Sequence, residues 1–308
     1  MNSHSGITVF APGSVGNVGP GLDILGLAVA GAGDTVHVEW HHGEGVSVLD
    51  SGHPDLPTDP GRNTAAIAAQ AVLARASVSR GVALRLTKGL PLSGGQGGSA
   101  ASAVAGAVAA NELAQLGLDH AALLECAIEA EATVAGRHAD NVAPSLLGGF
   151  VLVRSLAPMD VIRLPLPESV RVVLVHPDQR LLTRDARAVL PESVSREVAL
   201  HQAAHVAAMV AGACLGDLAL LGRGLDDRIA EPARSALLPG FLAAQAAARE
   251  AGALGGSISG AGPTAFALTV GDASGERVLA AMLATYHAAG VRATGRIATV
   301  DHQGARRV

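Results

Sequence analysis

Short runs in which apolar and polar residues alternate lie between longer, alanine-rich apolar runs along the whole chain. Alternation indicates a half-buried strand, and a long apolar run that begins at a capping residue indicates a helix. By this pattern we expect strands at residues 7–10, 25–30, 34–40, 82–87, 149–154, 170–176, 265–270 and 296–301. We expect helices at 64–75, 100–116, 121–134, 242–251 and 275–288, with a short one opening at 183 and another around 201–205.

The segment 11–23, between the first two strands, is rich in glycine and proline. These residues interrupt both helices and strands, so we expect no regular structure there. Asn17 and Asp23 are polar groups held in this tight backbone, although ordinary turn chemistry explains them equally well. Residues 41–60 are polar and rich in proline, and we expect a surface excursion without chemistry.

A glycine-rich loop at residues 90–102 lies between the strand at 82–87 and the helix that follows. Four glycines, at 94, 95, 97 and 98, let backbone N–H groups approach a ligand closely. Unpaired N–H groups and the helix dipole then point at the same place, which makes an anion site. A flexible turn between strand and helix is the simpler alternative.

Two common phosphate motifs fit this loop poorly. A Walker A loop needs a Lys followed by Ser or Thr after its last glycine, and Gly98 is followed by Ser99 and Ala100. Residues 95–100 fit the dinucleotide pattern G-x-G-x-x-G/A, which needs an acidic residue at the end of a second strand about twenty residues later. The candidate, Asp119, is expected to be a helix N-cap, so this interpretation is disfavoured.

Polar residues also gather elsewhere. Glu131, His138, Asp140 and Asn141 lie between a helix and a strand, and a functional role is about as probable as a structural one. A second glycine-rich loop at 254–264 makes a ligand shared with the first loop more probable. His201 and His205 have the i, i+4 spacing of zinc ligands. No third ligand is evident, and we interpret this pair as part of a half-buried helix face.

Composition narrows the class of protein. The 308 residues, 49% hydrophobic and 16% charged, suit two folded domains, and a break in composition near 158–167 suggests boundaries of 1–157 and 158–308. The 2% aromatic content and the net charge of −5 argue against a nucleic-acid binder.

Cys126 and Cys214 are interpreted as buried free thiols of a reduced cytoplasmic protein. Residues 1–5 carry no basic charge and suggest no signal peptide, and the apolar helix 100–116 is too short for a confident membrane span.

The loop resembles the phosphate loop of the GHMP small-molecule kinases. Pro91, Gly95, Gly97, Ser99 and Ala100 match the family pattern, whereas Gln96 replaces the usual Leu and Gly98 replaces the first Ser of a pair. Five further segments are similar to family motifs in the same order, most closely to those of the branch that acts on homoserine. They are 11–26, 138–144, 183–191, 229–241 and 257–264.

This resemblance implies a two-domain α+β fold, with a ribosomal-S5-like N-terminal domain and a ferredoxin-like C-terminal domain. It also implies a transferase that binds ATP and Mg²⁺ between the domains and phosphorylates the side-chain hydroxyl of homoserine, a step toward threonine. The partner would be this small molecule, with no nucleic acid and no membrane. A homodimer is expected only from the general frequency of dimers.

The resemblance also assigns roles by position. Nucleotide contacts would come from Asn63, Lys88, Pro91, Leu92, Ser93, Gly94, Gly95, Gln96, Gly97, Gly98, Ser99, Ala100 and Ala101. Mg²⁺ would be held by Ser99 and Glu131. The homoserine pocket would be lined by Asn17, Asp23, His138, Asn141, Thr183, Arg187 and Arg234, with Asn17 and Asn141 as the catalytic pair.

Elementary chemistry agrees with these roles. Asp23 supplies an anion for an α-ammonium group, and the forks of Arg187 and Arg234 suit a carboxylate. Asn141 orients a hydroxyl but cannot take its proton, so no general base is assigned and Asp140 is the residue to check. The glycine at position 98 removes a hydroxyl, which predicts ATP binding about tenfold weaker. The spacing from Glu131 to His138 is one residue shorter than in the family pattern, which could shift the metal ligand.

Two alternatives stay open at this point. The first is a GHMP kinase that acts on a different small alcohol. The second is a catalytically weak relative that binds a nucleotide or an amino acid as a sensor. A panel of alcohol substrates decides the first alternative, and turnover of ATP with homoserine excludes the second.

Overall fold

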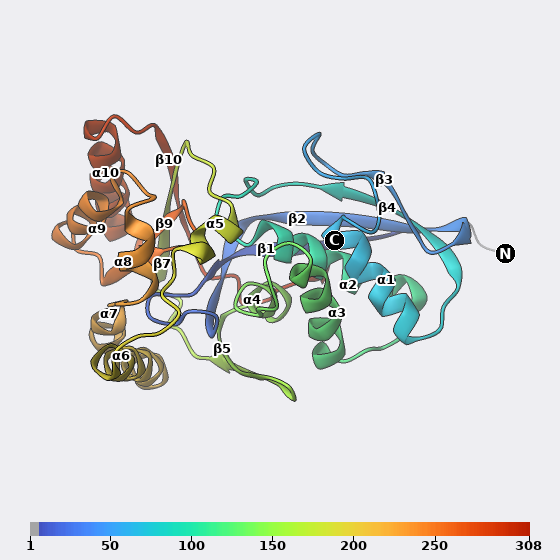
Figure 1. Cartoon of the computed structure of the whole chain (residues 1–308), viewed down its shortest axis with the longest axis horizontal. Coiled ribbons are helices and arrows are strands. Elements are labelled where there is room, and N and C mark those ends of the chain that lie inside the picture. Colours follow the sequence, from blue (N-terminus) through green and yellow to red (C-terminus); the bar gives the residue numbers. More distant parts are fainter. Residues whose placement is uncertain (1–5) are drawn as a thin grey trace.

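The computed structural model describes residues 6–308; residues 1–5, where we expect no signal peptide, lie outside the described part. Two halves lie end to end, each with helices packed on a sheet (Figure 1). The sheet of the first half runs β11-β1-β2-β4-β3, and β2 also pairs with β5, which pairs with β6. Its strands are β1 (Ile7–Gly16), β2 (Leu25–Glu44), β3 (Val46–Asp50), β4 (Arg80–Thr87), β5 (Phe150–Leu156), β6 (Met159–Leu164) and β11 (Arg306–Arg307).

Strand β1 continues to Gly16, so the prediction of no regular structure is wrong for residues 11–16. Residues 17–23 contain no helix or strand, as predicted. Pairing with β2 extends across a register shift between Pro12 and Gly13, which absorbs the irregular residues. Similarly, the two strands expected at 25–30 and 34–40 are one continuous strand. β3 lies inside the expected surface excursion and pairs in parallel with β4.

The helices of the first half are α1 (Thr64–Arg75), α2 (Gly98–Ala114), α3 (His120–Ala132) and α4 (Val142–Leu147). Asn63 caps α1 and Asp119 caps α3, as the sequence predicts. Alanine and glycine let α1 and α2 approach closely, because a Cβ at Gly106 would overlap the carbonyl oxygen of Ala65. Their buried faces join the strands in one core of Ala, Val and Leu.

The sheet of the second half has the order β10-β7-β9-β8, and every pair is antiparallel. In chain order this is 4-1-3-2, the arrangement of a ferredoxin-like domain. Its strands are β7 (Val170–Pro177), β8 (Gly255–Ile258), β9 (Ala265–Val270) and β10 (Ala293–Ala298). Its helices are α5 (Thr183–Ala188), α6 (Arg196–Leu215), α7 (Leu218–Gly224), α8 (Ala230–Ser235), α9 (Phe241–Glu250) and α10 (Asp272–Ala288).

Strand β7 shows how the two faces of this sheet are used. Val172 and Leu174 pack with α6 and α7, whereas Val173 and Val175 pack with α9 and α10, since side chains alternate along a strand. The first of these cores also contains Leu25 and Phe150 of the other sheet. One core therefore couples the two halves.

The expected boundary between residues 157 and 158 falls in the turn between β5 and β6, two strands of one sheet. The chain also returns to the first half at its end, where β11 pairs with β1.

Both cysteines are free thiols. Cys126 is buried, but Cys214 is exposed, which corrects the expectation that both are buried. Among the described helices, α6 alone has the length and apolarity of a membrane span, and Met209 and Ala213 on it pack into the core. One such helix is weak evidence for a membrane protein.

Candidate active site

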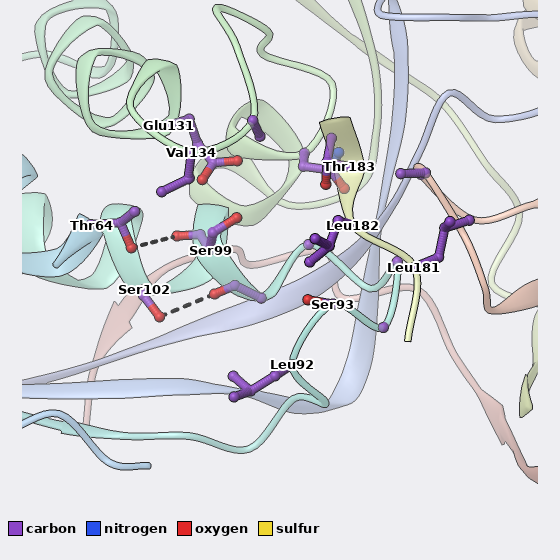
Figure 2. A pocket seen from close by; sticks show the side chains of 18 of the residues that line it. Thr64, Leu92, Ser93, Ser99, Ser102, Glu131, Val134, Leu181, Leu182 and Thr183 are labelled. Carbon is purple, nitrogen blue, oxygen red and sulfur yellow. Dashed lines mark hydrogen bonds between the residues drawn. The ribbon is translucent and has the colours of Figure 1, made fainter. Parts of the chain in front are cut away.

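A cleft of about 490 Å³ opens where the two halves meet. Figure 2 shows Glu131 and Ser99 of the first half on one wall and Leu181, Leu182 and Thr183 of the second half opposite. Most of the residues that the sequence predicts for the site line this cleft. They are Asn17, Asn63, Lys88, Pro91, Leu92, Ser93, Gly94, Gly95, Gly97, Gly98, Ser99, Glu131, His138, Asn141, Thr183, Arg187 and Arg234.

The glycine loop turns into α2 at Gly97, which has the left-handed φ of 69°. The first N–H groups of a helix have no acceptor within it, and the helix dipole makes this end positive. Gly98 and Ser99 are both on the wall of the cleft. Ala100 and Ala101 are fully buried, and the Ala101 N–H donates to Gly97 O at 2.8 Å. Contact of these two amides with phosphate stays a prediction, and for Ala101 it requires the exchange of this bond.

The two glycine-rich loops of the sequence bind each other. The hydroxyls of Ser259 and Thr264 donate to the carbonyl oxygens of Gly95 and Gly94 at 2.6 and 2.5 Å. Gly95 has a φ of 73°, and a Cβ there would lie 2.5 Å from Ser259 O. A side chain at Gly95 would therefore collide with the second loop, and the two hydrogen bonds between the loops hold the phosphate loop in its conformation.

The side chain of Gln96 takes part in the same contact between halves. It is buried, its Nε2 donates to Thr264 Oγ1 at 3.4 Å, and its Oε1 accepts from Arg296 Nη2 at 3.5 Å. Gln96 is not on the wall of the cleft, so its side chain serves to attach the loop to the second half. The polar residue that replaces the family's Leu thus has its own polar partners.

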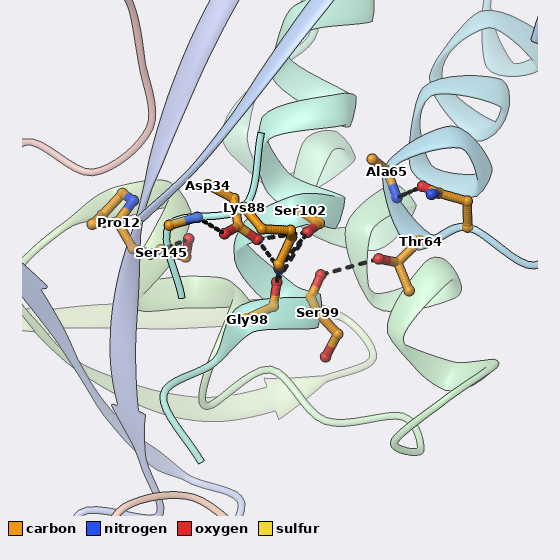
Figure 3. A network of polar contacts seen from close by, with 11 residues as sticks. Pro12, Asp34, Thr64, Ala65, Lys88, Gly98, Ser99, Ser102 and Ser145 are labelled. Carbon is orange, nitrogen blue, oxygen red and sulfur yellow. Dashed lines mark hydrogen bonds and ion pairs between the residues drawn. The ribbon is translucent and has the colours of Figure 1, made fainter. Parts of the chain in front are cut away.

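Lys88 lies at the centre of a buried polar network (Figure 3). Its ammonium donates to Asp34, to Gly98 O at 3.0 Å and to Ser102 Oγ at 3.1 Å, and Ser102 Oγ donates to Asp34 at 2.6 Å. These three bonds use all three protons of the ammonium and brace the first turn of α2. A direct contact of Lys88 with nucleotide stays a prediction, and it requires the exchange of one of these bonds.

Asn63 is similarly occupied. Its Oδ1 accepts from the N–H groups of Ala65 and Ala66, and its Nδ2 donates to Pro57 O at 3.0 Å. It holds the start of α1 against the cleft, and its contact with nucleotide stays a prediction.

Glu131 and Ser99 are the residues expected to hold Mg²⁺. Glu131 is buried at the end of α3, and its Oε1 has no hydrogen-bond partner. Burial, with a contribution from nearby Asp140, raises the pKa of Glu131 to about 7, against the opposing effects of the Ser99 hydroxyl and Lys88. An unpartnered, buried carboxylate oxygen beside a phosphate loop fits a hard divalent cation.

Asp140 is a second buried carboxylate at the cleft. It accepts from Asn17 N at 2.9 Å and from Asn141 Nδ2 at 3.4 Å. Burial, with a contribution from Asp23, raises the pKa of Asp140 to about 7. Asn141 Oδ1 also accepts from Ser14 Oγ at 3.0 Å, so this amide is fixed beside the glycine loop.

The end of the cleft next to α5 contains a partly exposed ion pair, of Arg187 and Asp23, which we call the open pair. Arg187 donates to both oxygens of Asp23, at 2.7 and 3.3 Å, and His138 Nδ1 lies 3.3 Å from the same carboxylate. Burial lowers the pKa of His138, so this ring favours the neutral form. The Nε of Arg187 is buried without a partner. Asp23 does not line the cleft itself but contacts two residues that do.

Two further polar residues lie at this end of the cleft. Arg234 comes from α8, and Asn17 comes from the turn after β1. Arg234 is fully buried and donates to Ala186 O and Gly260 O, both at 3.0 Å, while burial lowers its pKa. Asn17 has a left-handed φ of 62°; its Nδ2 donates to Gly260 O at 2.7 Å and its Oδ1 accepts from Asp23 N at 2.9 Å. In this structure Asn17 acts as a positioning residue for Asp23.

Sequence reasoning did not find Asp34, Ser102, Ser259 or Thr264. A signal was available for Asp34, because a carboxylate at the start of a half-buried strand needs a buried partner. The two hydroxyls of the second glycine loop carried no local signal, since their acceptors lie more than 160 positions earlier.

Both halves of the chain match models of one family of known proteins. Residues 63–149 match the GHMP kinases N terminal domain and residues 209–288 match the GHMP kinases C terminal domain. The chain is 42% identical to a homoserine kinase of Chlorobium phaeobacteroides over 89% of each chain. It is 41% identical to a homoserine kinase of Arabidopsis thaliana over 98% of this chain and 84% of that one.

A solved structure of a homoserine kinase from Cytophaga hutchinsonii superposes on the chain with a TM-score of 0.95. It is 40% identical and covers 100% of this chain and 99% of that one. The whole chain therefore has the same fold as this solved structure.

Proposed function

The chain belongs to the GHMP kinase family, and from that membership we propose that it phosphorylates the side-chain hydroxyl of L-homoserine with ATP. The product is O-phospho-L-homoserine. We also propose that this reaction is a step toward threonine and that the protein is cytoplasmic. A homodimer is the assembly to test first.

The observation that carries the choice of substrate is the open ion pair of Asp23 and Arg187 beside Arg234. An α-amino acid presents an ammonium and a carboxylate on one carbon, so it is recognised by an anion and a cation held side by side. Asp23, whose side chain is 30% exposed, would bind the ammonium, and the Arg187 guanidinium, which lies on the wall of the cleft, would bind the carboxylate. A substrate without an amino group would make no ion pair with the Asp23 carboxylate, and it would therefore bind more weakly than an α-amino acid.

The glycine loop and α2 supply the nucleotide end. The first-turn N–H groups and the positive end of the helix dipole bind the phosphates. Mg²⁺ held by Glu131 and Ser99 would neutralise charge on the phosphate oxygens. The network of Lys88, Asp34 and Ser102 keeps the first turn of α2 in place while the ligand binds.

Asn141 orients the attacking hydroxyl, and Asp140 holds Asn141 and the backbone of Asn17. Transfer through a loose transition state depends mainly on positioning and charge neutralisation, so no strong general base is needed. We assign none.

A coupled assay of ADP release with L-homoserine, L-threonine, L-serine and mevalonate tests the proposal. We expect turnover to be greatest with homoserine. Greater turnover with mevalonate identifies a GHMP kinase for a different alcohol, and the absence of turnover with every alcohol identifies a binding protein without this activity.

A further inference from the structure

His176 is a half-buried residue near the carboxyl end of β7, and no role has been given to it so far. Side chains alternate along a strand, so His176 lies on the same face of the sheet as Val172 and Leu174. These two residues belong to the core that couples the two halves. The ring of His176 therefore faces the first half, and its Nδ1 lies 2.9 Å from Thr264 Oγ1 in the second glycine-rich loop.

Chemistry fixes the direction of each hydrogen bond around the Thr264 hydroxyl. A carbonyl oxygen only accepts, so the single proton of Thr264 Oγ1 lies toward Gly94 O, 2.5 Å away. Gln96 Nε2 donates to the same hydroxyl at 3.4 Å, because Arg296, which only donates, is at the oxygen end of that amide. His176 must therefore donate as well, from a protonated Nδ1. Burial lowers the pKa of His176, so the ring favours the neutral form with this one proton.

This chain of hydrogen bonds ends on a peptide group of the phosphate loop. The peptide between Gly94 and Gly95 is trans and planar, so its C=O and its N–H point in opposite directions. Thr264 holds the Gly94 carbonyl toward the second loop, and the N–H of Gly95 consequently points away from that loop. A hydroxyl that accepts a hydrogen bond also donates a stronger one, so the bond from His176 strengthens this hold.

The next two peptide groups of the phosphate loop are held in the same way. Gly95 O accepts from Ser259 Oγ at 2.6 Å, and Gln96 O accepts from Ser14 N at 3.1 Å. Gly95 and Gly97 have left-handed φ values of 73° and 69°, whereas Gln96 between them does not. Such alternation turns successive N–H groups toward one concavity that suits an anion. Within residues 6–308 the N–H groups of residues 95–97 have no acceptor, and both glycines lie on the wall of the cleft.

We propose that His176 is a positioning residue for nucleotide binding: it orients the Thr264 hydroxyl, which fixes the Gly94–Gly95 peptide with its N–H available to a phosphate of ATP. The inference rests on the proposed function in one respect, that the glycine loop binds ATP. It gives β7, a strand of the second half, a part in nucleotide binding that depends on no contact between His176 and the ligand.

The test measures the binding of ATP with Mg²⁺ to the full chain by calorimetry, in the absence of homoserine. His176→Leu removes the donor and should raise the dissociation constant for ATP about 2–12-fold, the contribution of one neutral hydrogen bond. His176→Asn should restore the parent value, because the amide nitrogen of Asn can donate from the place of Nδ1. His176→Gln moves that donor one carbon further from the backbone, so it should resemble His176→Leu and replaces it if the leucine variant does not fold.

A second set of variants tests whether His176 acts through Thr264. Thr264→Val should weaken ATP binding at least as much as His176→Leu. Adding His176→Leu to Thr264→Val should cause no further loss, since two residues that act as one unit are not additive. The KM for homoserine should stay near the parent value in both His176 variants. His205→Leu, which removes a half-buried histidine bonded within α6, is the control and should bind ATP as the parent chain does.

The outcomes separate this proposal from the proposed function. ATP binding in His176→Leu equal to that of the parent chain, equal losses in His176→Leu and His176→Asn, or additive losses with Thr264→Val overturn the role of His176. ATP binding by the parent chain without turnover of homoserine overturns the proposed substrate and leaves the role of His176 open to the same measurements. A parent chain that does not bind ATP overturns both.

Discussion

Two ion pairs at the cleft differ in how fully their polar atoms are satisfied. In the pair of Lys88 and Asp34 the side chains are 7% and 0% exposed, and Ser102 and two backbone groups complete the bonding. In the pair of Arg187 and Asp23 they are 29% and 30% exposed, and Arg187 Nε has no partner. We call the pair of Lys88 and Asp34 the closed pair, because every proton of its ammonium already has an acceptor in this structure. The open pair of Arg187 and Asp23 has one N–H without a partner.

Breaking the closed pair should have the largest effect on stability. Asp34→Asn leaves the Lys88 ammonium buried without a counterion, which costs about 3–5 kcal/mol. Urea unfolding measures this loss. The matched variant Asp23→Asn, in the open pair, should change the free energy of unfolding by less than about 1 kcal/mol. Equal losses of stability in the two variants would remove the distinction between the pairs.

Glu131→Gln should lower kcat about 100-fold, equivalent to about 2.7 kcal/mol, with partial recovery at high Mg²⁺. The Gln side chain has no negative charge, so it would bind Mg²⁺ more weakly than the Glu131 carboxylate does. Steady-state assays across a range of Mg²⁺ concentrations measure it. Glu129→Gln, an exposed acid on the same helix, is the control; loss of activity there with parent-like kinetics in Glu131→Gln would show that the wrong acid was chosen.

Arg187→Ala and Arg234→Ala should each raise the KM for homoserine about 10–150-fold and leave the KM for ATP nearly unchanged. A hydrogen bond to a charged group contributes about 1.5–3 kcal/mol, which corresponds to this range. Arg184→Ala, an exposed neighbour in α5, should leave both constants near the parent values. An unchanged KM for homoserine in both variants places the two arginines outside the pocket.

Gly98→Ser should lower the KM for ATP by up to about tenfold, because it restores a hydroxyl near the phosphates. The structure has room for it: Gly98 has no left-handed φ, and an added Cβ would lie 3.4 Å from Lys88 Nζ. Gly97→Ser is the contrasting variant, since Gly97 has a φ of 69° and a Cβ would overlap the Ser14 hydroxyl. Weaker ATP binding in Gly98→Ser would assign Gly98 a backbone role that the geometry does not show.

Much of the fold follows from local sequence. The caps at Asn63 and Asp119, the glycine loop and the helix after it were predicted because short-range hydrogen bonds determine them. Strands β3 and β6 and the extension of β1 were missed, since their stability comes from pairing with distant strands.

Contacts between residues far apart in the sequence also limit what the sequence predicts about the sites. Most of the site residues that the sequence predicts, through motifs of the family, line the cleft. The sequence does not show that Lys88 bonds with Asp34, 54 positions earlier, or that Asp226 meets His201. Such partners depend on how helices and loops pack, which no local pattern encodes.

In the proposed function, the open pair of Asp23 and Arg187 would select an α-amino acid. The most direct measurement compares ADP release with L-homoserine, with 4-hydroxybutyrate, which lacks the ammonium, and with 3-aminopropan-1-ol, which lacks the carboxylate. We predict that kcat/KM falls at least about tenfold for each truncated alcohol, because each leaves a charged group of the pair without its ligand partner. A kcat/KM for 4-hydroxybutyrate equal to that for homoserine would contradict this account.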